Sequence, residues 1–357
     1  METNSKPTLY CQMGFIEKFL ALCRTSLDDL LLESGGHAET YSACFRLLYG
    51  AVNLYIDTET QTLIRHPNPL IKKLLKNPAA NIQCQPGMHT QMQSDEFWLQ
   101  TTTEVFMLDI PDAEAGEIEK DWGMMVLTPG NLANKSGQML ANTPIFAGQN
   151  EQTFSWNLLA SQRHCFHTAV IADNYIEGDE KKLALNLVPL LMAISSGPPR
   201  KRQLHLTIIT TSDGIEQIRK NLQKQIENKG IVCNLRVVKT LTLKNHDRHL
   251  ITNQRWIFSG FGFTLLKWDN YKRCSVVQQS TTILCMPVVS NGYVTYKTDE
   301  DNNNPASTCF SAVRDILGRL WKIDSETPEK IGTQLWAEGE RNMFRLNQVF
   351  TNNIVPN

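Results

Sequence analysis

The sequence predicts an α/β protein in which an N-terminal α+β domain, residues 1–160, precedes an α/β domain, residues 161–357, with a mostly parallel central sheet. Three observations favour this class. From residue 164 onward, apolar strand-like runs alternate with amphipathic helical stretches. A chain of 357 residues is long enough to bury two hydrophobic cores. Hydrophobic residues make up 41% and charged residues 20%, which is typical of an ordinary globular protein.

The N-terminal region predicts a mixture of helices and strands. Leucines and aromatic residues recur at spacings of three and four over residues 8–33, which predicts a helix, and Ser34-Gly35-Gly36 is a typical helix end. No chemical motif is present in this region. The remaining predicted elements are helices at 41–49 and 69–75 and strands at 51–56 and 123–127.

The C-terminal region predicts a series of strands and helices that implies right-handed crossovers and a mostly parallel sheet. We expect Ser212-Asp213 to cap a helix and Pro189 to disturb another. The predicted strands are 167–175, 204–210, 231–238, 249–252, 255–259 and 280–289, and the predicted helices are 183–194, 214–228 and 307–321, with a polar loop at 299–304.

Charge and cysteine content limit the classes of function. The net charge is −1, so any nucleic-acid surface must be local. Nine scattered cysteines without a C-x-x-C pair indicate reduced thiols, and neither a signal peptide nor a transmembrane segment is recognisable. We therefore predict a cytoplasmic protein, and the sequence predicts no cofactor and no metal site.

One motif stands out chemically. His246, Arg248, Asn253 and Gly260 form the pattern H-x-R-x-x-x-x-N-x6-G. On a strand, residues two apart face the same way, so His246 and Arg248 are expected to act together. An imidazole serves as nucleophile or acid near neutral pH, and a guanidinium grips phosphate with two donors. We predict that Arg248 and Asn253 bind phosphate, with His246 as the catalytic group if the protein is an enzyme.

This spacing resembles the signature of the phospholipase D superfamily, H-x-K-x-x-x-x-D-x6-G, with Arg in place of Lys and Asn in place of Asp. In that superfamily two copies of the motif meet, so the single copy here implies a homodimer. The following segment, with the motif glycines Gly260 and Gly262, departs from the G-S-x-N of catalytic members. It more closely resembles the H-D-R variant in the C-terminal domain of MIT-domain-containing protein 1, regarded as non-hydrolytic and membrane-associating, and related bacterial proteins in defence-type gene neighbourhoods.

The resemblance implies a catalytically weakened module that recognises a phosphodiester, most simply nucleic acid, in bacterial antiphage defence. One alternative is a homodimeric, metal-independent nuclease of the phospholipase D type that uses His246 from each subunit. Another is a module that docks a lipid headgroup at a membrane surface or a protein in a multi-protein system. A purely structural role for His246 and Arg248 as a buried hydrogen-bonded pair stays open beside these.

Other segments allow two interpretations each. Lys267, Trp268, Lys272 and Arg273 interleave cationic and aromatic residues as nucleic-acid surfaces do, or form a packed strand with an exposed basic edge. Arg200-Lys201-Arg202 is a phosphate-contacting or simply solvated loop. Asp173 caps a loop or approaches the ligand-binding edge of the sheet, and the cap is favoured. His164 and His167 are metal ligands or ordinary residues at a strand entry, and the latter is favoured.

Overall fold

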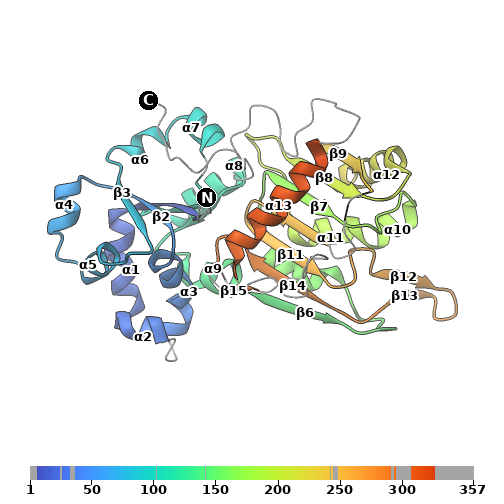
Figure 1. Cartoon of the computed structure of the whole chain (residues 1–357), viewed down its shortest axis with the longest axis horizontal. Coiled ribbons are helices and arrows are strands. Elements are labelled where there is room, and N and C mark those ends of the chain that lie inside the picture. Colours follow the sequence, from blue (N-terminus) through green and yellow to red (C-terminus); the bar gives the residue numbers. More distant parts are fainter. Residues whose placement is uncertain are drawn as a thin grey trace.

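The computed structural model describes residues 6–24, 26–32, 37–101, 103–140, 142–241, 243, 248–290, 293–294 and 307–325. These residues form an α/β protein built on two main β-sheets, shown side by side in Figure 1. The predicted glycine turn at 34–36, the residue His246 and the polar loop at 299–304 lie outside the described residues.

The first sheet has five strands in the order β3-β2-β1-β4-β5, and every neighbouring pair is parallel. The N-terminal domain is therefore α/β, and the predicted α+β arrangement is wrong. Parallel neighbours need a crossover connection, and helices supply it between these strands. The strands are β1 (Thr8–Gln12), β2 (Asn53–Asp57), β3 (Asn81–Cys84), β4 (Val105–Met107) and β5 (Met125–Leu127).

Helices cover both faces of this sheet, and alternate residues of β1 show it. Leu9 and Cys11 belong to one hydrophobic core, whereas Tyr10 belongs to the other. The first core packs α1 (Met13–Cys23), α2 (Leu27–Leu32), α3 (His37–Tyr49), α4 (Thr60–Arg65), α5 (Pro69–Leu75) and α9 (Leu132–Met139). The second packs α6 (Met88–Gln91), α7 (Asp95–Gln100) and α8 (Asp112–Trp122).

The predicted helix at 8–33 is wrong over its first five residues, which form β1 at the centre of the sheet. A strand that is buried on both faces is apolar throughout, so its pattern resembles that of a buried helix. The later part is helical, as α1 and α2. The helices predicted at 41–49 and 69–75 and the strands predicted at 51–56 and 123–127 are confirmed, with small shifts at their ends.

The second sheet has seven strands in the order β6-β14-β11-β10-β7-β8-β9, and it is mixed rather than mostly parallel. Only β7, β8 and β9 are parallel neighbours within it. The two residues between β10 and β11 allow only a hairpin, which forces an antiparallel pair. The strands are β6 (Thr143–Ala147), β7 (Thr168–Ala172), β8 (His205–Thr210), β9 (Asn234–Lys239), β10 (His249–Thr252), β11 (Arg255–Ser259) and β14 (Thr281–Pro287).

Two short antiparallel pairs flank this sheet. The hairpin of β12 (Leu266–Asp269) and β13 (Cys274–Val277) projects from the body of the protein in Figure 1, and β15 (Tyr293–Val294) pairs with β16 (Ser307–Thr308). One face of the large sheet packs on the 3-10 helix η1 (Trp156–Gln162) and on α10 (Glu180–Leu185), α11 (Leu187–Ile194) and α12 (Ile215–Glu227), and the other face packs on α13 (Cys309–Ser325). Within the described ranges, no helix is both long and apolar enough to cross a membrane.

Local sequence explains two departures from the predicted helices. The helix predicted at 183–194 is divided at Asn186, because Pro189 has no N–H to donate to the preceding turn. Ser212 does not cap α12, since Gly214 occupies the cap position without a side-chain bond. The Ser212 hydroxyl instead donates to the carbonyl oxygen of Ile176, at 2.6 Å.

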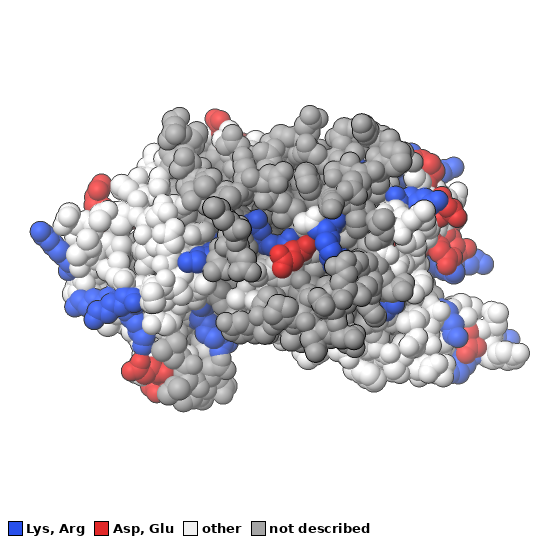
Figure 2. All heavy atoms as spheres, in the orientation of Figure 1, with Lys and Arg blue, Asp and Glu red and all other residues white. Residues whose placement is uncertain are grey.

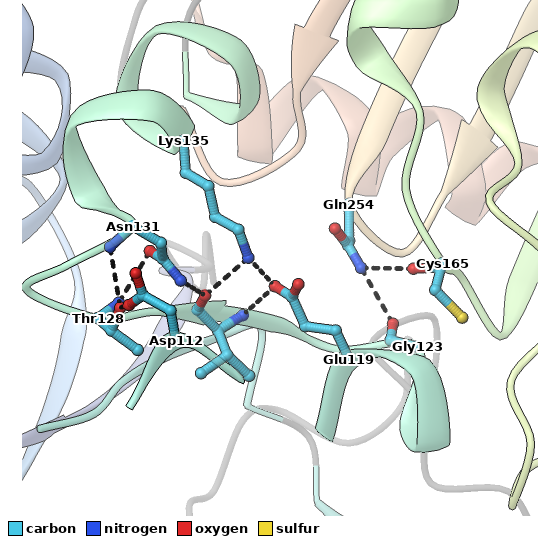
Figure 3. A network of polar contacts seen from close by, with 9 residues as sticks. Asp112, Glu119, Gly123, Thr128, Asn131, Lys135, Cys165 and Gln254 are labelled. Carbon is cyan, nitrogen blue, oxygen red and sulfur yellow. Dashed lines mark hydrogen bonds and ion pairs between the residues drawn. The ribbon is translucent and has the colours of Figure 1, made fainter. Parts of the chain in front are cut away.

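The strands divide between the two sheets after β5, since β6 pairs with β14 of the second sheet. This division falls before residue 160, where the sequence places the domain boundary. Figure 3 shows polar contacts along the boundary. Lys135 of α9 pairs with Glu119 of α8, and the amide of Gln254 donates to the carbonyl oxygens of Gly123, at 3.1 Å, and Cys165, at 2.8 Å. Gln254 thus joins the second domain to the end of α8 in the first.

Candidate functional site

Arg248 lies directly before β10, at the end of that strand where β7 finishes, since the two strands are antiparallel. Its guanidinium donates to the carbonyl oxygen of Gly260 and stacks over the ring of Tyr175, with 5.4 Å between the guanidinium carbon and the ring centre. Its Nε atom is buried and has no hydrogen-bond partner among the described residues. Arg248 is therefore held in place by the Gly260 carbonyl and the Tyr175 ring.

Asp173 follows β7 and is hydrogen-bonded to the loop at 260–265, which follows β11 and contains Gly260 and Gly262. We call this segment the motif loop. Its carboxylate accepts hydrogen bonds from the backbone N–H groups of Tyr175, at 2.9 Å, and Phe263, at 2.6 Å. Asp173 therefore caps its loop, as favoured, and also lies at the sheet edge that carries Arg248. Burial raises the pKa of Asp173 to about 6, although the two backbone bonds and the charge of Arg248 oppose the rise.

Close packing explains why glycine occupies positions 260 and 262. Gly262 has φ of 112°, and a Cβ atom there would lie 2.8 Å from Oδ2 of Asp173. A Cβ atom on Gly260 would lie 2.9 Å from Oγ1 of Thr281 on the neighbouring strand β14. The loop after β11 can approach Asp173 and β14 only because these positions lack side chains.

Asn253 does not join Arg248. It follows β10 at the opposite end, about 16 Å away at the usual rise of a strand. Its Oδ1 accepts from the N–H of His167, at 3.2 Å, and its Nδ2 donates to the carbonyl oxygen of Gly123, at 2.8 Å. The Oδ1 bond lies within the second domain, whereas the Nδ2 bond crosses to the end of α8 in the first domain.

This contact explains why Asn suits position 253. The group facing the Gly123 carbonyl must be a donor, and a carboxylate has none at neutral pH. Gly123 itself has φ of 68°, and a Cβ atom there would lie 2.8 Å from the backbone nitrogen of His167. The amide is thus matched to a close backbone approach, at the end of β10 opposite to Arg248.

A pocket of about 280 Å³ opens beside Tyr175. We call it the aromatic pocket, and Tyr175 joins it to the motif because the same ring lies under Arg248. The rings of Tyr175 and Phe261 are nearly parallel, at 11°, with centres 6.5 Å apart. Lys267 and Trp268, both predicted surface residues, line the pocket. The other lining residues are Glu177, Lys181, Lys182, Leu185, Thr264, Leu266 and Gln278.

Lys272 and Arg273, also predicted surface residues, are exposed in the turn of the hairpin, outside the pocket lining. Asp269 orders this turn by accepting from the N–H groups of Tyr271, at 2.9 Å, and Lys272, at 3.2 Å. On the face in Figure 2, basic side chains lie in separate groups among acidic ones, with one group at the end of the molecule formed by the hairpin. Positive charge is therefore confined to small areas of this face, as expected for a chain with a net charge of −1.

The basic loop at 200–202 contacts the first domain. Arg200 forms ion pairs with Glu117, at 2.6 Å, and Asp121, at 2.5 Å. Lys201 pairs with Asp95, at 3.2 Å, and lies over the ring of Trp122. Arg200 and Lys201 are exposed, as the solvated interpretation expects, and they are also ion-paired with acidic residues from a distant part of the chain, whereas Arg202 is buried.

His164 is buried at the entry to β7, as the favoured interpretation expects. Its Nδ1 lies 2.8 Å from the carbonyl oxygen of Gln162, and its Nε2 lies 3.0 Å from the hydroxyl of Thr252. Burial lowers the pKa of His164 to about 3, so the ring is neutral. Across the part of the chain that the structure describes, no group of three or more His, Cys, Asp or Glu side chains could hold a metal ion.

Sequence reasoning missed Tyr175, Phe261, Lys181 and Lys182 as parts of the pocket. Tyr175 and Phe261 carried a signal, since one follows a strand end and the other lies inside the motif loop. The lysines of α10 carried none, because lysines on an exposed helix face are ordinary. No family model and no curated protein sequence matches this chain.

Proposed function

We propose that this protein recognises a phosphodiester, with nucleic acid as the ligand, through a phospholipase-D-like C-terminal domain whose hydrolytic chemistry is weakened. The observation that carries the proposal is the position of Arg248. Its guanidinium is fixed by the Gly260 carbonyl and by the ring of Tyr175, and Tyr175 also lines a pocket together with lysines and other aromatic rings. A fixed guanidinium is suited to a phosphate oxygen.

One feature supports weakened hydrolysis. Asn253 serves the domain contact, so no carboxylate stands at this motif position. Arg248 replaces the lysine of the catalytic signature, and its guanidinium keeps the capacity to bind phosphate. The mixed α/β sheet, with the motif at the start of a strand, is compatible with the proposed fold.

Fluorescence anisotropy with a labelled oligothymidine tests the proposal. We expect Arg248→Ala to weaken binding. The slope of log affinity against log salt concentration (the salt slope) should fall by about one, the value for one phosphate contact. Arg248→Lys should keep the salt slope and lose part of the affinity, because lysine binds phosphate as a point charge. Arg219→Ala is the matched control, since Arg219 is an ion-paired residue on α12 outside the pocket lining.

Unchanged affinity in Arg248→Ala would show that this residue is not the phosphate site. Cleavage of DNA or RNA in EDTA by the wild type, lost in His246→Ala, would instead assign the protein as a nuclease. A role in antiphage defence stays a prediction from resemblance, and phage challenge of cells carrying wild type or Arg248→Ala tests it.

A further inference from the structure

The aromatic pocket presents ring surface to solvent. Tyr175 is 46% exposed and Trp268 is 59% exposed, whereas Trp256 of the same domain is 1% exposed. Exposed aromatic rings gathered at one concave site are uncommon and mark a binding surface. Because the rings are planar and one of them already stacks on Arg248, the surface is suited to another planar group.

The charges around the pocket favour an anion. Three lysines and one glutamate line it, and Lys182 pairs with Glu177 at 2.7 Å. Lys181 and Lys267 make no ion pair with any residue that the structure describes. With Arg248 beside Tyr175, cationic groups lie next to the aromatic surface, as in proteins that bind single-stranded nucleic acid.

The pocket is fixed before any ligand arrives. Asn186, buried between α10 and α11, accepts from the N–H of Leu266 at 2.6 Å and donates to the carbonyl oxygen of the same residue at 2.9 Å. Thr264 donates to the carbonyl oxygen of Tyr175, at 2.9 Å. These bonds hold the start of the hairpin and the loop after β7 together, so little ordering entropy is lost on binding.

We propose that the aromatic pocket receives one unstacked base of a single-stranded nucleic acid, a substrate class that rests on the phosphodiester function above. In a duplex every base is stacked and paired, so its face cannot reach Tyr175 or Trp268 without being flipped out. A volume of about 280 Å³ suits one planar group. The amide nitrogen of Gln278 already donates to the carbonyl oxygen of Thr264, at 2.8 Å, and is not free to form a hydrogen bond with the edge of a base. We therefore expect the base to be held mainly by stacking on the aromatic rings.

The test compares three probes of equal length by fluorescence anisotropy: an oligothymidine, an abasic strand with the same backbone, and a duplex. We expect the oligothymidine to bind roughly tenfold more tightly than either of the others, because stacking on an aromatic side chain contributes that much per base. Trp268→Ala should remove most of this preference, and Trp268→Phe should keep part of it. Tyr271→Ala is the matched control, since Tyr271 lies on the same hairpin, fully exposed and outside the pocket lining.

Equal affinity for the thymidine and abasic strands, or a preference for the duplex, overturns the base pocket. If Arg248→Ala still weakens all three probes in that case, the phosphodiester function stands without the pocket. If Arg248→Ala changes nothing, both proposals fail. Flotation of the protein with anionic vesicles, abolished by Trp268→Ala and without any oligonucleotide binding, overturns the pocket in favour of a lipid surface.

Discussion

The guanidinium carbon of Arg248 lies 5.4 Å from the centre of the Tyr175 ring, and this stacking joins the sequence motif to the aromatic pocket. The two residues come from different connections of the sheet, one before β10 and one after β7. Tyr175 also lines the pocket, so its ring connects the pocket to the guanidinium of Arg248. Four predictions follow from this arrangement and from the contacts that hold it.

Tyr175→Ala should weaken oligonucleotide binding by more than the loss of stacking on the base alone. The substitution also removes the cation–π contact that positions Arg248, worth about 0.5–2 kcal/mol. Tyr175→Phe keeps the ring and should bind nearly as the wild type does. Anisotropy titrations of both variants measure this, and equal losses in Ala and Phe would contradict a role for the ring.

Asn253→Ala should lower the free energy of unfolding by about 1–3 kcal/mol, since it leaves the buried His167 N–H without its partner and removes one of the two side-chain amides that donate to the Gly123 carbonyl. Asn253→Asp, which restores the residue of the catalytic signature, should be at least as destabilising. Its carboxylate would face the Gly123 carbonyl oxygen and repel it. Urea denaturation measures both variants.

The binding data for Asn253 provide the contrast with Arg248. Affinity measured on folded Asn253→Ala protein should match that of the wild type, because the residue lies at the far end of β10. If Asn253→Ala lost oligonucleotide affinity without losing stability, Asn253 would be part of the ligand site.

Gly262→Ala should cost about 1–3 kcal/mol of stability, because φ of 112° is unfavourable for alanine and the new Cβ would press on the Asp173 carboxylate. The loop that holds Arg248 should shift with it, so oligonucleotide affinity falls as well. Gly230→Ala is a control, since Gly230 also has positive φ, at 84°, but nothing lies within 4 Å of its Cβ position. A Gly262→Ala variant no less stable than Gly230→Ala would contradict the packing argument.

Asp173 should make the protein less stable as pH rises from about 4 to 6. Burial raises its pKa in the folded state to about 6, above the ordinary 3.8 of the unfolded chain. Between these values the folded state binds more protons than the unfolded state, so raising the pH disfavours folding, by about 3 kcal/mol in total. Above pH 6 the contribution is constant.

Asp173→Asn isolates this effect, because the amide does not titrate. Asparagine keeps one acceptor, so the variant loses a backbone hydrogen bond at every pH, but its stability should lack the decline between pH 4 and 6. Chemical denaturation across this range measures the difference between the two proteins. A difference that does not change with pH would show that Asp173 titrates normally.

The sequence determined the local elements of this protein. The strands at 249–252 and 255–259, the helix at 69–75 and the strand–helix series after residue 164 follow from apolar periodicity and turn residues, which act over a few neighbours. The motif was expected to place Arg248 on a strand, whereas Arg248 lies directly before β10. The central strand β1 was missed, because a run buried on both faces has no polar side to mark it.

Only the tertiary structure decided what the motif residues contact. Asn253 was predicted to bind phosphate, but its amide is hydrogen-bonded to Gly123 and His167, which approach it from other parts of the fold. The aromatic pocket likewise combines the loop after β7, helix α10, the motif loop and the β12–β13 hairpin. Contacts between segments so far apart depend on how the sheet orders its strands, and no short-range pattern in the sequence carries that information.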